Sequence, residues 1–144
     1  MTIEWDEHIA VRPRGDGVYD AELTDGWVVG GGVNGGYLLA TIGNAISHEL
    51  PDKPDPIAVS AYYLSATTPG PAQVQTRVLR TGGSVATVGA DLVQGDVARI
   101  TALATTAVSA TCPTMCVRRR RSRSCPRVTS ACPTRWRLLR SARH

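Results

Sequence analysis

The sequence predicts an α+β domain in which an antiparallel sheet wraps around one central helix. Between residues 35 and 50, apolar residues recur at steps of three and four, which is typical of a helix with one buried face. Several segments that favour strands surround this helix, and the connections between them are short. Parallel neighbours would need connections of a dozen residues or more, so we expect antiparallel pairing. Packing the helix on the sheet buries the apolar faces of both.

The composition predicts one acidic domain followed by a basic tail. The 144 residues are 42% hydrophobic and 19% charged, which excludes a disordered polar chain and a bundle of membrane helices. Residues 1–106 contain all 12 Asp and Glu but only six Lys and Arg, whereas residues 107–144 contain ten Arg and no acid. We therefore expect a domain over residues 1–106 and a separate segment over residues 107–144.

The segment 107–144 has the composition that a GC-rich gene yields when it is read out of frame, so we expect it to be disordered or poorly packed. Its run of arginines would also suit phosphate binding, but no aromatic residue interleaves with the run to stack on bases. The four cysteines are separated by three, eight and six residues, so the paired C-x2-C spacing of structural zinc sites is absent. We expect no metal and no cofactor, and nucleic-acid binding is a weaker alternative.

The elements follow from the sequence in chain order. A first strand is expected over residues 18–23, and Thr24, Asp25 and Gly26 end it. The helix begins after Asn34, whose side chain is a good N-cap, and ends before Pro51. Four more strands are expected, joined by short connections into a meander in which each pairs with the next: residues 57–66, 73–80, 85–94 and 97–105.

A glycine-rich segment, GGGVNGG over residues 30–36, directly precedes the helix. Gly30, Gly32 and Gly35 satisfy the G-x-G-x-x-G pattern of dinucleotide sites, but that pattern requires a βαβ unit, which is not expected here. Alternatively, Gly35 and Gly36 expose first-turn amides that could polarise a carbonyl oxygen with the help of the helix dipole. Close packing of helix on sheet would demand the same glycines, and spacing alone does not separate these two interpretations.

Three segments carry a family resemblance: GGGVNGGYLLA (30–40), PIAVSAYYLSATTPGPAQV (56–74) and VLRTGGSVATVGADLVQGD (78–96). Over residues 16–106 the chain resembles the N-terminal half of acyl-CoA thioesterase II-like proteins of the hot-dog superfamily. The resemblance implies a hot-dog fold and hydrolysis of fatty acyl-CoA thioesters to free acid and CoA. That family usually joins two hot-dog halves in one chain and takes most of its catalytic Asp, Thr and Gln from the second half. The resemblance therefore leaves open whether this chain alone is active.

The candidate catalytic residues are Asp25, Asn34, Gly35 and Gly36. In some other hot-dog thioesterases a carboxylate in the loop before the helix attacks or directs water at the thioester, and Asp25 is similarly placed. An Asp-Gly turn that simply ends the first strand is the alternative interpretation of Asp25. Asn34 would cap the helix and orient the glycine amides. Three further residues are candidates for substrate binding: Tyr37, Ser84 and Gln94.

Two other functions remain as alternatives to thioester hydrolysis. One is a noncatalytic module that binds acyl thioesters, and the weaker one is a nucleic-acid-associated protein with a basic tail. A lone hot-dog sheet exposes an edge, so we expect a homo-oligomer, either a dimer or a dimer of dimers. We expect no membrane span and no signal peptide, because residues 1–14 contain acids and lack an apolar stretch. A cytoplasmic protein is expected.

Overall fold

The computed structural model describes residues 4–108. The predictions made for the arginine- and cysteine-rich segment fall almost entirely on residues 109–144, outside the described residues. Within the described residues, no helix is both long and apolar enough to span a bilayer.

One long helix, α2 (Gly35–Glu49), forms the centre of the fold. It begins where the sequence predicts, because the Asn34 side chain caps it. One face of the helix is buried against the sheet, and the buried residues recur at helical spacing: Tyr37, Leu38, Thr41, Ile42, Ala45 and Ile46.

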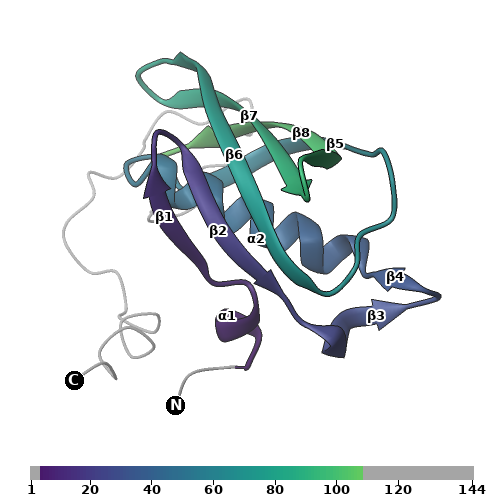
Figure 1. Cartoon of the computed structure of the whole chain (residues 1–144). Coiled ribbons are helices and arrows are strands. Elements are labelled where there is room, and N and C mark those ends of the chain that lie inside the picture. Colours follow the sequence, from purple (N-terminus) through teal and green to yellow (C-terminus); the bar gives the residue numbers. More distant parts are fainter. Residues whose placement is uncertain (1–3, 109–144) are drawn as a thin grey trace, which may run out of the picture. The chain divides into compact units, whose positions relative to one another are not determined.

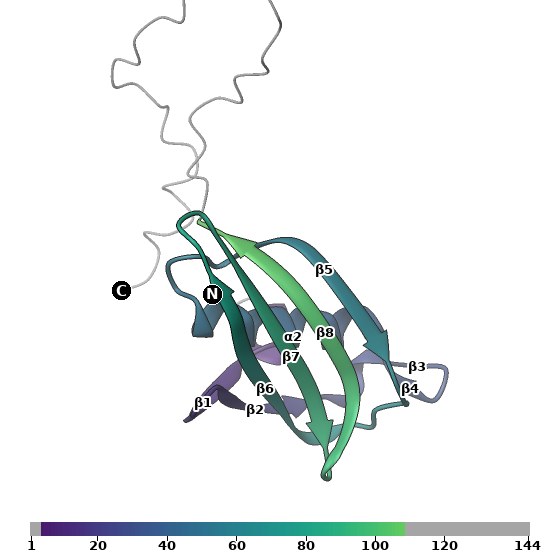
Figure 2. The same cartoon turned by 90° about the horizontal axis from the view of Figure 1, so that it is seen from above.

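A six-stranded antiparallel sheet curves around α2 (Figures 1 and 2). In chain order its strands are β1 (Val11–Gly15), β2 (Val18–Leu23), β5 (Asp55–Tyr63), β6 (Gly70–Thr81), β7 (Val85–Gln94) and β8 (Val97–Ala107). In space their order is β1-β2-β6-β7-β8-β5, so β1 and β5 are the edge strands. The predicted α+β class and the wrapped antiparallel sheet are confirmed.

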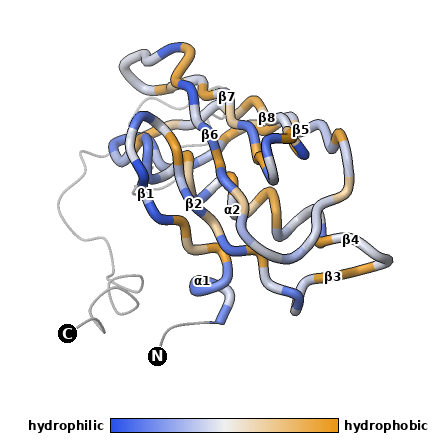
Figure 3. Tube along the Cα trace, in the orientation of Figure 1, coloured by the Kyte–Doolittle hydropathy of each residue, from blue (hydrophilic) through white to orange (hydrophobic). Residues whose placement is uncertain are grey.

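The core lies between α2 and the concave face of the sheet. Alternate residues of β7 and β8 point into it, and Val88, Leu92 and Ile100 are at most 1% exposed. Figure 3 shows hydrophobic and hydrophilic residues mixed along the strands of the sheet, hydrophilic residues at α1 and a hydrophobic stretch at β3 (Val28–Val29).

The predicted meander is correct for β6, β7 and β8 but wrong for β5. That strand pairs with β8, with Val59 opposite Ala104 and Tyr63 opposite Ile100, and it has no pairing with β6. Residues 64–69 connect β5 to β6 past two intervening strands, a separation of about 14 Å. Six extended residues reach about 20 Å, so a short connection does not require that the two strands be neighbours.

Five short elements were absent from the predicted element order. Helix α1 (Glu4–His8) and strand β1 precede the first predicted strand, and a 3-10 turn, η1 (Asp25–Trp27), follows β2. A small hairpin, β3 (Val28–Val29) with β4 (Gly32–Val33), leads into α2. Its tip is formed by Gly30 and Gly31, whose positive φ angles of 62° and 89° explain the need for glycine there.

Candidate functional site

The first turn of α2 presents one backbone amide without a hydrogen-bond partner. The Asn34 side-chain oxygen Oδ1 accepts from the Gly36 amide at 2.9 Å and from the Tyr37 amide at 3.2 Å. The Leu38 amide donates to the Asn34 carbonyl at 3.1 Å. Among the described residues, nothing accepts from the Gly35 amide. The cap therefore uses two of the first-turn donors and leaves Gly35 as the free one.

Tyr63, at the end of β5, covers Gly35. Its hydroxyl donates to the Gly35 carbonyl oxygen at 2.9 Å. A Cβ atom added at Gly35 would lie 3.0 Å from Cε1 and 3.2 Å from Cζ of the tyrosine ring. A side chain at position 35 would thus be in tight contact with the tyrosine ring, which would have to move by a few tenths of an ångström. Close packing therefore favours glycine there and accounts for at least part of the glycine-rich sequence.

Two cavities open on either side of this first turn. The first, which we call the glycine pocket, has a volume of about 410 Å³ and lies between the β3–β4 hairpin and the connection from β5 to β6; its lining includes Gly30, Gly31, Gly35, Tyr63 and Thr67. The second, the apolar groove, has a volume of about 310 Å³ and runs along α2 beside β5 and β8; its lining includes Gly36, Leu39, Gly43, Ile46, Val59 and Thr106. Adjacent residues of one helical turn thus face two different environments.

Asp25 lies in η1, close in the chain to this turn. The Asn34 amide donates to the carbonyl of Trp27 at 2.8 Å, which ties the end of η1 to the start of α2. The Asp25 side chain is exposed, and in the described part of the chain it makes no hydrogen bond or ion pair. The turn interpretation is compatible with its local structure, because Thr24 caps η1 by accepting from the Gly26 amide at 3.3 Å.

Tyr37 is buried rather than open to solvent, with 1% of its surface exposed. Its ring stacks on that of Trp27 with centroids 5.7 Å apart, and its hydroxyl donates to the His8 carbonyl at 2.8 Å. Burial raises the pKa of the Tyr37 phenol. The Trp27 indole N–H in turn donates to Nδ1 of His8 at 3.1 Å. Tyr37 therefore fixes η1 and α1 against α2. The hydrogen bond between Trp27 and His8 could not be predicted from the sequence, where the two residues are 19 positions apart.

Gln94 and Ser84 lie at opposite ends of β7. The Gln94 amide group holds the connection between β5 and β6, because Nε2 donates to the Thr68 carbonyl at 2.8 Å and Oε1 accepts from the Thr68 amide at 3.2 Å. The same connection lines the glycine pocket, so Gln94 holds one wall of that pocket in place. Ser84 is exposed in the β6–β7 turn. The length of β7 separates it from the first turn of α2, and the structure does not bring Ser84 together with Asn34, Gly35 and Gly36 in this chain.

Thr67 and Tyr63 are site residues that the sequence did not indicate. Thr67 is 2% exposed and lines the glycine pocket, and its hydroxyl has no hydrogen-bond partner among the described residues. Its carbonyl accepts from the Val33 amide at 3.2 Å, which joins the two sides of the pocket. A tyrosine at the end of a strand and a threonine in a connection are too common to signal a site, and only the fold brings them to the same pocket as Gly35.

The far end of α2 carries a carboxylate held by hydroxyl groups. The Tyr19 hydroxyl donates to Oε2 of Glu49 at 2.7 Å, and the Thr76 hydroxyl lies 3.2 Å from the same oxygen. Burial, and to a smaller extent the hydrogen bond to Glu49, raises the pKa of Tyr19 to about 12. A carboxylate is unfavourable near a helix C-terminus, and the hydrogen bond from Tyr19 compensates for that. We regard this cluster as structural.

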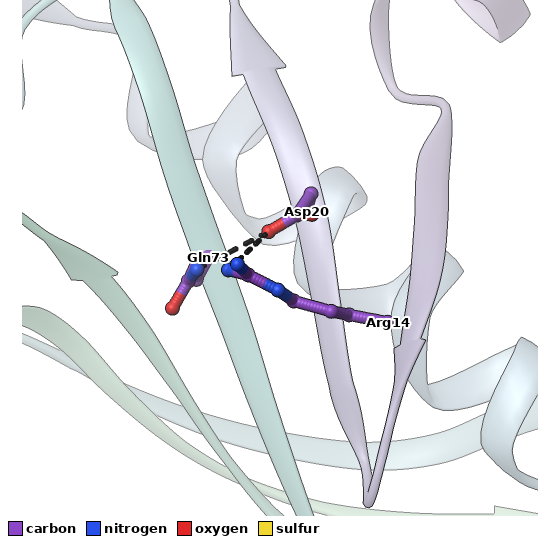
Figure 4. Close-up of polar contacts among 3 residues, drawn as sticks. All are labelled: Arg14, Asp20 and Gln73. Carbon is purple, nitrogen blue, oxygen red and sulfur yellow. Dashed lines mark hydrogen bonds and ion pairs between the residues drawn. The ribbon is translucent and has the colours of Figure 1, made fainter.

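A third cavity, of about 540 Å³, lies over β1, β2 and β6, away from the first turn of α2. Asp20 accepts there from Nε2 of Gln73 at 3.2 Å and lies 3.6 Å from the Arg14 guanidinium (Figure 4). Both members of the ion pair are about half exposed or more, at 62% and 49%, so the pair contributes little stability. The lining mixes acids and bases and favours no one ligand class. Residues 4–108 contain no group of three or more His, Cys, Asp or Glu that could hold a metal ion.

Comparison with known proteins identifies a family match over most of the described chain. The family model described as the acyl-CoA thioesterase N-terminal domain matches residues 23–110. The hot-dog architecture is also present in solved structures. A candidate thioesterase II from Thermobifida fusca is 27% identical, with a TM-score of 0.71 over 88% of this chain and 45% of its own. A hot-dog protein of unknown function from Alicyclobacillus acidocaldarius is 19% identical, with a TM-score of 0.69 over 92% of this chain and 46% of its own.

A curated relative gives the same picture of partial length. An uncharacterized protein of Mycobacterium tuberculosis is 31% identical over 84 residues, which are 54% of this chain and 28% of that protein. The chain thus spans less than half the length of the Thermobifida fusca protein and about a quarter of the mycobacterial one.

Proposed function

The chain belongs to the family of acyl-CoA thioesterase N-terminal domains, and on this premise we propose that it binds fatty acyl-CoA and hydrolyses the thioester to free acid and CoA. One observation carries the proposal: the first turn of α2 meets the apolar groove at Gly36 and the glycine pocket at Gly35. An acyl chain in the groove and the thiol-bearing arm of CoA in the glycine pocket would bring the thioester carbonyl between these two glycines. Cavities of a few hundred Å³ with few polar groups are typical of such ligand sites.

The free Gly35 amide is the proposed donor to the carbonyl oxygen. As water adds to the carbonyl carbon, negative charge develops on that oxygen, and both the amide and the positive end of the helix dipole stabilise it. The Gly36 amide is already bonded to Asn34, so Asn34 acts in this proposal by fixing the turn. Tyr63 holds the Gly35 carbonyl and keeps the peptide in place.

Asp25 is the proposed general base. It would take a proton from the attacking water, and the tetrahedral intermediate would then expel the CoA sulfur, which receives the proton. Two observations support this role: the Asp25 side chain is exposed, and it lies in η1, two residues before Trp27. The Trp27 carbonyl accepts from the Asn34 amide, which ties η1 to the first turn of α2. Tyr37, Trp27 and His8 would act as positioning residues for this loop, and Gln94 for the glycine pocket.

A noncatalytic module that binds acyl thioesters is the second candidate function. The observation that favours it is the Asp25 side chain, which makes no hydrogen bond to any described residue that would orient it toward the Gly35 amide. Such a module would use the same groove and pocket but would release no thiol.

We propose further that a second hot-dog domain, from a second copy of the chain, pairs with β5. This edge strand is largely exposed, with Ile57 at 62%, Tyr62 at 66% and Tyr63 at 53%. An unpaired apolar edge favours association. Because Val59 and Tyr63 of this strand also line the cavities, a partner along β5 would enclose the site. Sedimentation of the full chain should show a dimer or a larger species, and a Val59→Lys variant should shift it toward monomer.

Thiol release tests the proposed activity. The purified full chain is incubated with medium- and long-chain acyl-CoA, and the released CoA thiol is followed with a thiol reagent. Release that is lost in Asp25→Ala supports hydrolysis, whereas tight binding of acyl-CoA without release supports the binding module. Neither binding nor release would refute both. A cytoplasmic location stays a prediction from the sequence.

A further inference from the structure

The apolar groove contains one buried hydroxyl group with no hydrogen-bond partner. Thr106 of β8 is 0% exposed and lines the groove, and its Oγ1 makes no hydrogen bond to any residue that the structure describes. Proteins rarely bury a polar side chain in this state, because the lost hydration is not replaced. This threonine therefore needs an explanation that the packing of the chain alone does not supply.

Strand register places Thr106 at the end of the groove that is remote from the first turn of α2. Ile100 pairs with Tyr63, which covers Gly35, whereas Thr106 pairs with Pro56 near the start of β5. Six residues along β8 separate the two positions, a distance of about 20 Å. On the helix side the lining runs from Gly36 to Ile46, about 15 Å along the axis.

The rest of the lining contains no polar side chain. Besides Thr106 it consists of glycine, alanine, leucine, isoleucine, proline and valine residues. A buried water usually needs two to four polar partners, and a single hydroxyl in an apolar groove does not meet that need. The lining also has no cation, so a carboxylate at this depth would be buried without a counter-charge. A neutral oxygen attached to an apolar chain fits both conditions.

We propose that the apolar groove selects acyl chains of medium length that carry a hydroxyl or keto oxygen near the distal end, and that this oxygen hydrogen-bonds Thr106. The inference rests on the proposed function, since it assumes that the thioester lies at the first turn of α2. A chain that starts at Gly36 and extends about 15 Å along α2 ends close to Thr106. Rotation about χ1 exchanges the methyl and hydroxyl positions of a threonine, so the oxygen can turn toward a ligand that reaches it.

Binding of two matched ligands tests this selectivity. Isothermal titration calorimetry of the full chain compares the nonhydrolysable thioether analogues of dodecanoyl-CoA and 12-hydroxydodecanoyl-CoA. Three variants are compared with the unaltered chain. Thr106→Val removes the hydroxyl but keeps the shape, Thr106→Ser keeps a hydroxyl, and Thr105→Val makes the same change on the opposite face of β8.

The unaltered chain should bind the hydroxylated analogue about fivefold more tightly, as one neutral hydrogen bond implies. Thr106→Val should abolish this preference, so that the two analogues bind equally, while Thr106→Ser and Thr105→Val should retain it. Equal affinity for the two analogues, or a preference that survives Thr106→Val, would overturn the inference and leave the proposed function standing. If neither analogue binds, both the inference and the proposed function fail.

Discussion

Replacing Asn34 in two ways separates its capping role from the electrostatics of the site. Asn34 accepts from the Gly36 and Tyr37 amides at 2.9 Å and 3.2 Å. Asn34→Ala removes this cap and should lower the free energy of unfolding by about 1 kcal/mol. For a domain of this size that corresponds to a fall in Tm of about 4–8 °C. Asn34→Asp keeps the acceptor and adds a negative charge beside the helix N-terminus, so stability should be unchanged or slightly higher.

The same two variants should affect catalysis differently. An oxyanion at the Gly35 amide would lie about 5 Å from an aspartate at position 34, and at an effective dielectric constant of about 20 their repulsion is about 3 kcal/mol. Asn34→Asp should therefore lower kcat/KM by about a hundredfold. Thermal unfolding followed by circular dichroism and thiol release from dodecanoyl-CoA measure the two effects. An Asn34→Asp variant that keeps full activity would refute the proposed site for the carbonyl oxygen, and one that loses its fold would refute the capping argument.

Three further predictions concern other parts of the chain. Asp25→Asn should lower kcat by about a hundredfold with little change in Tm, and an unchanged kcat would exclude this residue as the base. Gln94→Leu should lower the free energy of unfolding by about 1 kcal/mol, because its bonds to Thr68 are lost; a fall in kcat/KM at unchanged stability, measured by urea unfolding, would instead indicate direct contact with substrate. Tyr19 has a pKa of about 12 in the folded chain against about 10 when unfolded. The folded state thus favours the protonated phenol, and the full contribution of Tyr19 to stability is present below about pH 10. That stabilisation should be lost as the pH rises from 10 to 12, by about 2 kcal/mol, and the loss should be absent in Tyr19→Phe, whereas parallel stability curves for the two proteins would contradict it.

The sequence predicts the parts of the fold that depend on local signals. Asn34 before an apolar stripe marks the start of α2, and the turns at Gly82–Gly83 and Gly95–Asp96 mark the hairpins that join β6, β7 and β8. Strand β5 shows what local signals do not predict. Its length and direction follow from the sequence, but its pairing with β8 depends on how the sheet closes around the helix, which is a property of distant residues.

The candidate site divides in the same way. The cap at Asn34 follows from local patterns. The packing that favours glycine at position 35 does not, because the tyrosine that contacts that glycine is 28 residues away in the chain. Likewise, the bonds of Gln94 to Thr68 and the burial of Thr106 in the groove are set by tertiary packing. Nothing in the neighbouring sequence of these residues distinguishes them from ordinary strand positions.

Amide chemical shifts recorded while a nonhydrolysable dodecanoyl-CoA analogue is added report most directly where an acyl thioester binds. We predict the largest changes at the Gly35 and Gly36 amides, with further changes along the groove-lining residues of α2 and β8. Shifts confined to the cavity over β1, β2 and β6, with the two glycine amides unaffected, would contradict the assignment of the site.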